Sequence, residues 1–317
     1  MIEAPVRTTS PASVEETLRA EIARGDAVAN AVQPILPFLL AQPDNSMVGD
    51  DILARVRGMM SHLADQLLDV LAGGSPAAGG QIRHHAQIET VTQALRQAPE
   101  LLGHLHALAL EWQLTERLQR GLAVDPVVPP LMQSALASPE RAMRELAMEL
   151  VNAQTRWHQS QRRMQLSLLE LPPEQLDAAW GALRSSVTGE GRFAAAEAKI
   201  HSCYDEEAGR LALAKRLLAS MGRSVGVALD VIQAGASLFV TALALGSGQT
   251  RDAVCLSTHR TQLTRLALTL RATGLGVDVI ERQVLMLHPE AMLPRGLDRL
   301  SPDRATAILT NTRVEAL

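Results

Sequence analysis

Apolar residues recur with helical spacing along most of the chain. Between residues 50 and 71 the large apolar side chains that share one helical face are Ile52, Val56, Met59, Leu63, Leu67 and Val70. Similar stripes occur between residues 82 and 95 and between 99 and 118. The strand-favouring residues Phe, Trp and Tyr make up only 2% of the chain. The sequence therefore predicts an all-α protein.

Two stretches predict long helices with a narrow apolar seam. In the first, the residues at seven-residue intervals are Met143, Leu150, Trp157 and Met164. The second is expected to run from Arg192 to Met221, and its seam comprises Phe193, Ile200, Ala214 and Met221. Such seams pack together at a small crossing angle. We therefore predict a multi-helix bundle whose spine is two long antiparallel helices.

Short apolar-faced helices fill the stretch between Ala234 and Leu287, with glycine or polar residues between them. Thr250 is expected to be the N-cap of one of these helices. Helices shorter than about 15 residues are marginal in water, so each must bury its apolar face on its neighbours. We expect these helices to lie along the two long ones.

Glycine and proline predict the boundaries. Gly25 is expected to end the first helix, and Pro34 and Pro37 to break or kink the second. Residues 72–81 hold four glycines, a proline and no large apolar side chain, which is typical of a linker. We therefore divide the chain into a helical segment (1–72), a linker (73–81), a helical domain (82–293) and a C-terminal helix and tail (294–317).

Composition excludes several classes of partner. The net charge is -4, and aromatic residues are too few to interleave with arginines in a nucleic-acid groove. The most apolar stretch is too short for the roughly 20 residues that span a bilayer. Two cysteines are too few for a disulfide framework. We expect a cytoplasmic protein with no nucleic-acid partner, no transmembrane segment and no cofactor.

Three runs resemble the DUF2336 family of bacterial proteins: HALALEWQLTERLQ (106–119), SQRRMQLSLLELPPEQL (160–176) and LFVTALALGSGQTRDAVCLSTHRTQLTRLALTLRATGL (238–275). The resemblance covers most of residues 81–290. It implies an all-helical fold with HEAT-like short-helix repeats and supplies no catalytic residues. The family has no established function, so the resemblance leaves activity open.

Histidines on two neighbouring predicted helices are candidate metal or ligand residues. His85 lies on one predicted helix, and His104, His106 and Trp112 lie on the next helix. Antiparallel packing would let two histidines approach each other and hold a metal. His85 falls on an apolar stripe, however, so a histidine at the edge of the core is the alternative.

Arginines form the other candidate site. Arg156, Arg162 and Arg163 cluster at the end of the first long helix, and Arg260 and Arg265 lie among the short helices. They could bind an anionic partner or stabilise helix C-termini. His201 and Cys203 point about 200° apart on one helix, so they cannot form a nucleophile–base pair there. We interpret Cys203 as a buried structural thiol.

No catalytic set of acid, base and nucleophile assembles from these patterns, so the sequence favours a protein that is not an enzyme. Stacked helical repeats offer extended concave surfaces. Our leading hypothesis is a non-catalytic helical scaffold or regulator that binds a protein partner in such a groove, with a homodimer left open. The alternative is a helical sensor of a small ligand or metal near His85, His104 and Trp112.

Overall fold

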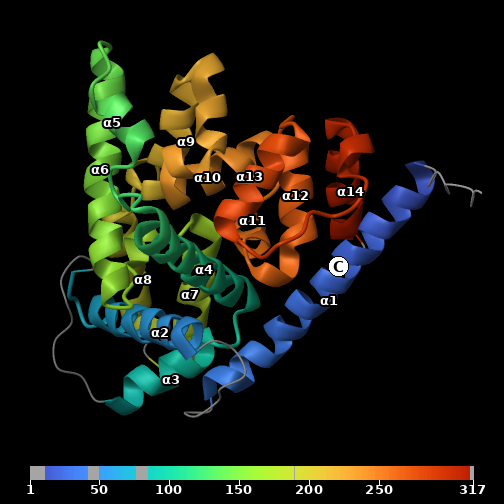
Figure 1. The fold of residues 1–317 in the computed structure, drawn as a ribbon. Helices are drawn as coiled ribbons and strands as arrows, with labels where there is room; N and C mark the ends of the chain where they lie inside the picture. Colours follow the sequence, from blue (N-terminus) through green and yellow to red (C-terminus); the bar gives the residue numbers. More distant parts are fainter. Residues whose placement is uncertain (1–10, 42–49, 76–84, 189, 315–317) are drawn as a thin grey trace, which may run out of the picture. The chain divides into compact units, whose positions relative to one another are not determined.

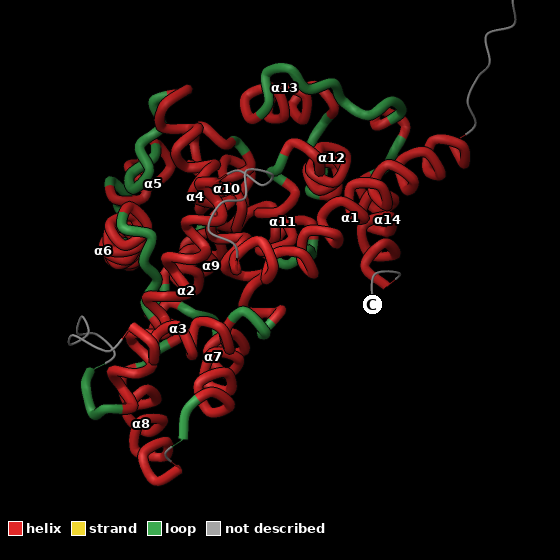
Figure 2. Tube along the Cα trace, turned by 90° about the horizontal axis from the view of Figure 1, so that it is seen from below, coloured by secondary structure: helices red, strands yellow, loops and turns green. Residues whose placement is uncertain are grey.

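The computed structural model describes residues 11–41, 50–75, 85–188 and 190–314. Every regular element in these ranges is an α-helix or a short 3₁₀-helix (Figure 2). The predicted all-α class is confirmed. Contacts divide the chain into two units: unit 1 comprises Met1–Ala31 and Ala242–Leu317, and unit 2 comprises Val32–Thr241.

The helices of unit 2 include three long ones, α2, α4 and α6, and several shorter ones. Their bounds are α2 (Asp50–Leu71), α3 (His85–Leu95), α4 (Pro99–Leu122), α5 (Pro130–Leu136), α6 (Arg141–Arg162), η1 (Leu168–Glu170), α7 (Pro173–Ser186), α8 (Glu190–Cys203), η2 (Glu206–Ala208), α9 (Arg210–Ser220) and η3 (Gly222–Leu229).

Helix α2 packs against α3, α4, α7 and α8 (Figure 1). The side chains of its predicted stripe are buried, with Val56, Met59, Leu63 and Leu67 fully enclosed. Helix α6 packs against α5 on one part of its surface and α9 on another. The periodicity of α2 and α6 therefore identified two helices of the core.

The helices of unit 1 are short apart from the start of α1. Their bounds are α11 (Arg251–Ser257), η4 (Arg260–Gln262), α12 (Leu263–Ala272), α13 (Val277–Leu287), η5 (Leu297–Arg299) and α14 (Pro302–Val314). Helix α12 packs against α11, α13 and α14, and its buried face includes Leu266, Ala267 and Leu270. Two helices continue across the division between the units: α1 (Pro11–Ala41) and α10 (Val231–Ser247).

The predicted stop at Gly25 is wrong, because α1 continues through this residue. Helix α1 also continues through Pro34 and Pro37, so these prolines do not break it. Gly25 lies instead where the backbone of α1 comes close to the side chain of Gln262. A Cβ at Gly25 would lie 3.1 Å from the Gln262 side chain, and Gln262 Nε2 donates a hydrogen bond of 2.7 Å to the Gly25 carbonyl. This contact ties α1 to η4 within unit 1.

The predicted helix from Arg192 to Met221 is also wrong, because the chain leaves helical geometry between α8 and α9. Asp205 accepts a hydrogen bond from the Glu207 N–H and caps η2, and Gly209 has extended backbone angles. The break leaves α9 packed against α6, so part of the predicted pairing exists. Two long antiparallel helices and HEAT-like repeats are not confirmed.

The two units do not coincide with the predicted segments. Helix α2 packs within unit 2 although it precedes the predicted linker, and α14 packs within unit 1. Most of the linker (73–81) lies outside the described residues. The contacts that define the units join residues that are far apart in the sequence. The composition of a short segment does not indicate such contacts.

Candidate functional site

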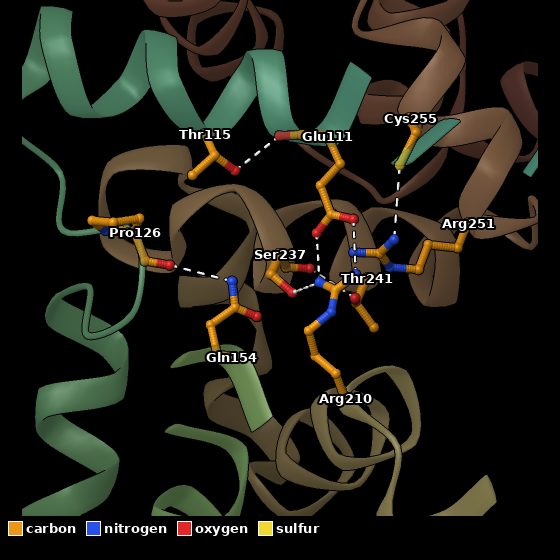
Figure 3. A network of polar contacts seen from close by, with 9 residues as sticks. All are labelled: Glu111, Thr115, Pro126, Gln154, Arg210, Ser237, Thr241, Arg251 and Cys255. Atoms are coloured by element: carbon orange, nitrogen blue, oxygen red, sulfur yellow. Dashed lines mark hydrogen bonds and ion pairs between the residues drawn. The ribbon is translucent and has the colours of Figure 1, made fainter. Parts of the chain in front are cut away.

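A buried ion pair joins α9 to α4 in unit 2. Arg210 donates from its two terminal nitrogens to the two carboxylate oxygens of Glu111, at 2.7 and 3.1 Å (Figure 3). The Arg210 side chain is 2% exposed and that of Glu111 is 0% exposed. Ser237 accepts a further hydrogen bond of 2.9 Å from Arg210. Burial of a charge without its partner costs several kcal/mol, so each charge requires the other.

Aromatic rings and guanidinium groups stack around this pair. The Arg210 guanidinium carbon lies 4.1 Å from the centre of the Trp157 ring, and the Trp157 and Trp112 rings are 6.0 Å apart. The Arg55 guanidinium carbon lies 4.6 Å from the centre of the Trp112 ring. Cation–π contacts strengthen where water is excluded. The stack therefore places two guanidinium groups against two indole rings inside unit 2.

Residues 164–172, just after the end of α6, are held against α2, and we call them the strap. Gln66 on α2 donates to the Leu166 carbonyl at 2.8 Å and accepts from the Leu168 N–H at 3.1 Å. One buried amide side chain thus satisfies two backbone groups that no regular element pairs. Arg55 also donates to the Gln161 carbonyl at the end of α6.

The strap begins at a residue with left-handed backbone geometry. Met164 has φ 56°, and the Gln165 N–H donates to the Ser160 carbonyl at 2.9 Å, which closes the end of α6. Gly58 on α2 faces this turn, where an added Cβ would lie 2.7 Å from Met164 Cβ. Glycine at this position allows the strap to lie directly on α2.

The turn between α8 and α9 is tied to the other end of the strap. The Tyr204 hydroxyl donates a hydrogen bond of 2.9 Å to the Leu171 carbonyl. Burial, with smaller contributions from Glu206 and Asp177, raises the pKa of Tyr204 to about 12. The hydroxyl therefore remains protonated at neutral pH and keeps donating to the strap.

A cavity of about 360 Å³ lies between α6, the strap, the end of α8 and η2, all within unit 2. Its lining is partly polar and partly apolar: Arg156, Trp157, Ser160, Leu166, Ser167, Leu169, Glu170, Cys203, Asp205, Ala208 and Gly209. Ligand pockets in proteins occupy roughly 300 to 1,000 Å³. The volume therefore suits a small molecule.

Glu170 lines both this cavity and a smaller one beside the start of α9. Burial raises the pKa of Glu170, while the charges of Arg210 and Arg156 and a hydrogen bond from the Arg210 backbone N–H act in the opposite direction. The net rise means that the free site favours the protonated carboxyl more than water does. A cation placed nearby would reverse this preference.

Arg156 is the one predicted arginine that lines the cavity. Its side chain is exposed and forms no hydrogen bond or ion pair within the part of the chain that the structure describes. Arg162 and Arg163 are exposed beyond the cavity lining, and Arg260 is exposed in unit 1. Arg265 binds Asp26 through two hydrogen bonds of 3.2 and 2.5 Å. The two residues form an ion pair within unit 1.

The structure describes only part of the predicted histidine site. His104 is buried and His106 half-buried on α4, Trp112 belongs to the stack, and the His85 side chain lies outside the described residues. Among the described residues, no group of three or more His, Cys, Asp or Glu side chains could hold a metal. His104 and His106 are two positions apart, so they point in nearly opposite directions on α4.

The prediction that Cys203 is buried is wrong. Cys203 is exposed at the end of α8 and lines the cavity, whereas Cys255 is buried in unit 1. The cavity lining contains no histidine among the described residues. Sequence analysis also missed Glu170, Asp205 and Arg210. The one available signal was Glu111, an acid within the apolar run 105–114, which indicates a buried basic partner.

No family model, no curated protein and no solved structure matches the chain. The resemblance to DUF2336 therefore stays a prediction. No single helix in the described ranges is both long and apolar enough to cross a membrane; α10 and α11 meet the criterion only together, across a bend.

Proposed function

We propose that the protein is a non-catalytic helical regulatory protein whose unit 2 binds a small polar molecule in the cavity beside the strap. The observation that carries this proposal is the unpaired Arg156 guanidinium at a cavity of about 360 Å³ that also contains Glu170. An exposed charge without a protein partner keeps its capacity to bind a ligand. The proposal refines the sensor hypothesis and moves its site from the histidines to this cavity.

The rigidity of the surroundings supports binding. The stack of Arg210, Trp157, Trp112 and Arg55 lies under one wall, and Gln66 holds the strap that forms another. Walls fixed in this way lose little conformational freedom when a ligand enters, so more of the contact energy appears as affinity. Regulation would follow if the ligand linked the strap to the turn after α8.

Catalysis is a weaker proposal for the same cavity. Cys203 is its only nucleophilic thiol in the described lining, and its sulfur lies 3.7 Å from the Ser202 hydroxyl. A cysteine nucleophile requires a neighbouring base or cation that lowers its pKa. Binding of a protein partner in a groove of stacked helices remains a hypothesis, and the cavity is where an experiment can begin.

Cys203 provides the test because it is exposed at the cavity, whereas Cys255 is fully buried. We would measure alkylation of Cys203 by iodoacetamide, using mass spectrometry, in the presence of a panel of amino acids, carboxylic acids, amines, sugars and nucleosides. At least one class should slow the reaction and raise the unfolding midpoint. Ser160→Trp, which fills the cavity, should abolish both effects, and Gln159→Trp, on the exposed face of α6, should not. A panel without any protecting compound would refute the proposal.

A further inference from the structure

The charges around the cavity come from different elements and have opposite signs. Arg156 lies on α6, Glu170 on η1 and Asp205 at the start of η2. Asp205 Oδ1 accepts a hydrogen bond of 3.0 Å from the Glu207 N–H, which leaves Oδ2 without a hydrogen bond among the described residues. A ligand with one charge would meet an attractive group and a repulsive group together.

We infer that the cavity binds a small zwitterion, a molecule with both a carboxylate and an ammonium group, of the kind represented by amino acids with an apolar side chain. This inference rests on the proposed function. Arg156 would bind the carboxylate through two parallel hydrogen bonds, the geometry that guanidinium favours. Glu170 and Asp205 would accept hydrogen bonds from the ammonium group.

The apolar residues of the lining favour a ligand that carries an apolar side chain in addition to its two charged groups. Trp157, Leu166 and Leu169 provide an apolar surface beside the charged groups. An aliphatic side chain placed there would leave water, at a gain that scales with the area buried. The volume is at the small end of the range for ligand pockets. L-leucine is therefore the probe that we choose.

Binding of a zwitterion should release a proton from Glu170, and this release can be measured independently of affinity. The groups around Glu170 are Arg156 on α6, Arg210 and Lys215 on α9, and Tyr204, Asp205 and Glu206 in the turn. An ammonium group beside Glu170 would stabilise its charged form, so binding would release a proton from the fraction that is protonated. Affinity for leucine would therefore rise as pH increases through the pKa of Glu170 in the free protein.

Three matched probes test the ligand class on the full chain: L-leucine, 3-methylbutylamine, which lacks the carboxylate, and 4-methylpentanoate, which lacks the amine. Isothermal titration calorimetry in two buffers of different ionisation enthalpy measures affinity and proton release, and Cys203 alkylation reports occupancy of the cavity. We expect leucine to bind at least tenfold more tightly than either fragment. Equal binding of one fragment, or no binding of leucine, would overturn the inference.

Variants separate the two ends of the ligand. Arg156→Ala should reduce affinity for leucine and 4-methylpentanoate at least tenfold while leaving the amine little changed. Glu170→Gln should abolish the proton release, and Arg163→Ala, an exposed arginine outside the lining, should change neither quantity. If leucine and the other amino acids fail and a compound of another class in the panel protects Cys203, the ligand class is wrong and the proposed function stands. If the whole panel fails, the proposed function fails as well.

Discussion

The guanidinium carbon of Arg210 lies 4.1 Å from the centre of the Trp157 ring, and the same guanidinium binds both carboxylate oxygens of Glu111. Arg210 comes from the start of α9, Trp157 from α6 and Glu111 from α4. One buried charge therefore joins three helices of unit 2. Trp157 also lines the cavity, so the ion pair supports the wall against which a ligand would lie.

The first prediction concerns this ion pair. Arg210→Met should destabilise unit 2 by about 3 to 5 kcal/mol, because the buried Glu111 carboxylate loses both of its hydrogen bonds from Arg210. The double variant Arg210→Met with Glu111→Leu should recover most of the loss, since it removes both desolvated charges. Urea denaturation followed by tryptophan fluorescence measures both values. Equal destabilisation by the single and double variants would show that packing, and not charge, governs this region.

The second prediction tests the contact between α2 and the strap. Gly58→Ala should destabilise the protein by about 1 to 3 kcal/mol, because the new methyl group would overlap Met164 and force the strap outward. Gly121→Ala on α4 is the matched control, since nothing lies within 4 Å of its added Cβ. That variant should be neutral or stabilising by about 0.5 to 1 kcal/mol. Thermal unfolding of the two variants side by side gives the comparison.

The sequence predicted those features that depend on local signals. The stripe of α2 is buried as its periodicity indicated, and Thr250 caps α11 by accepting a hydrogen bond of 3.3 Å from the Ala253 N–H. Both depend on residues within a few turns of one helix. The all-α class follows in the same way, because it is the sum of many such local preferences.

Features that depend on distant residues could not be predicted. A proline inside a helix usually breaks it, yet α1 continues through Pro34 and Pro37. The apolar seam predicted one helix across Tyr204–Gly209 because its spacing there matches a helix even though the chain turns. The cavity is lined by side chains from α6, the strap, α8 and η2. The spacing of residues within one segment does not indicate which distant segments lie beside it.

The third prediction tests how the strap is held. Gln66→Leu should cost about 1 to 3 kcal/mol, because the buried Leu168 N–H loses its acceptor and the Leu166 carbonyl loses one donor. It should also accelerate hydrogen exchange in the strap, while exchange in α2 changes less. Gln159→Leu, on an exposed part of α6, provides the control and should change neither measurement. An unchanged exchange rate at Leu168 would contradict the assigned role of Gln66.

The last prediction concerns pH. Since the pKa of Glu170 in the folded protein is raised above its ordinary value, the folded protein binds more protons than the unfolded chain between those two values. The contribution of Glu170 to stability is therefore fully present below the unfolded pKa and is lost as pH rises through the folded one. Glu170→Gln stays neutral and can still accept the hydrogen bond from the Arg210 N–H. Its unfolding midpoint should exceed that of the original protein near pH 8, and the difference should shrink as pH falls towards 4. A difference that is constant with pH, or a lower midpoint near pH 8, would show that the neighbouring arginines outweigh burial at this carboxyl.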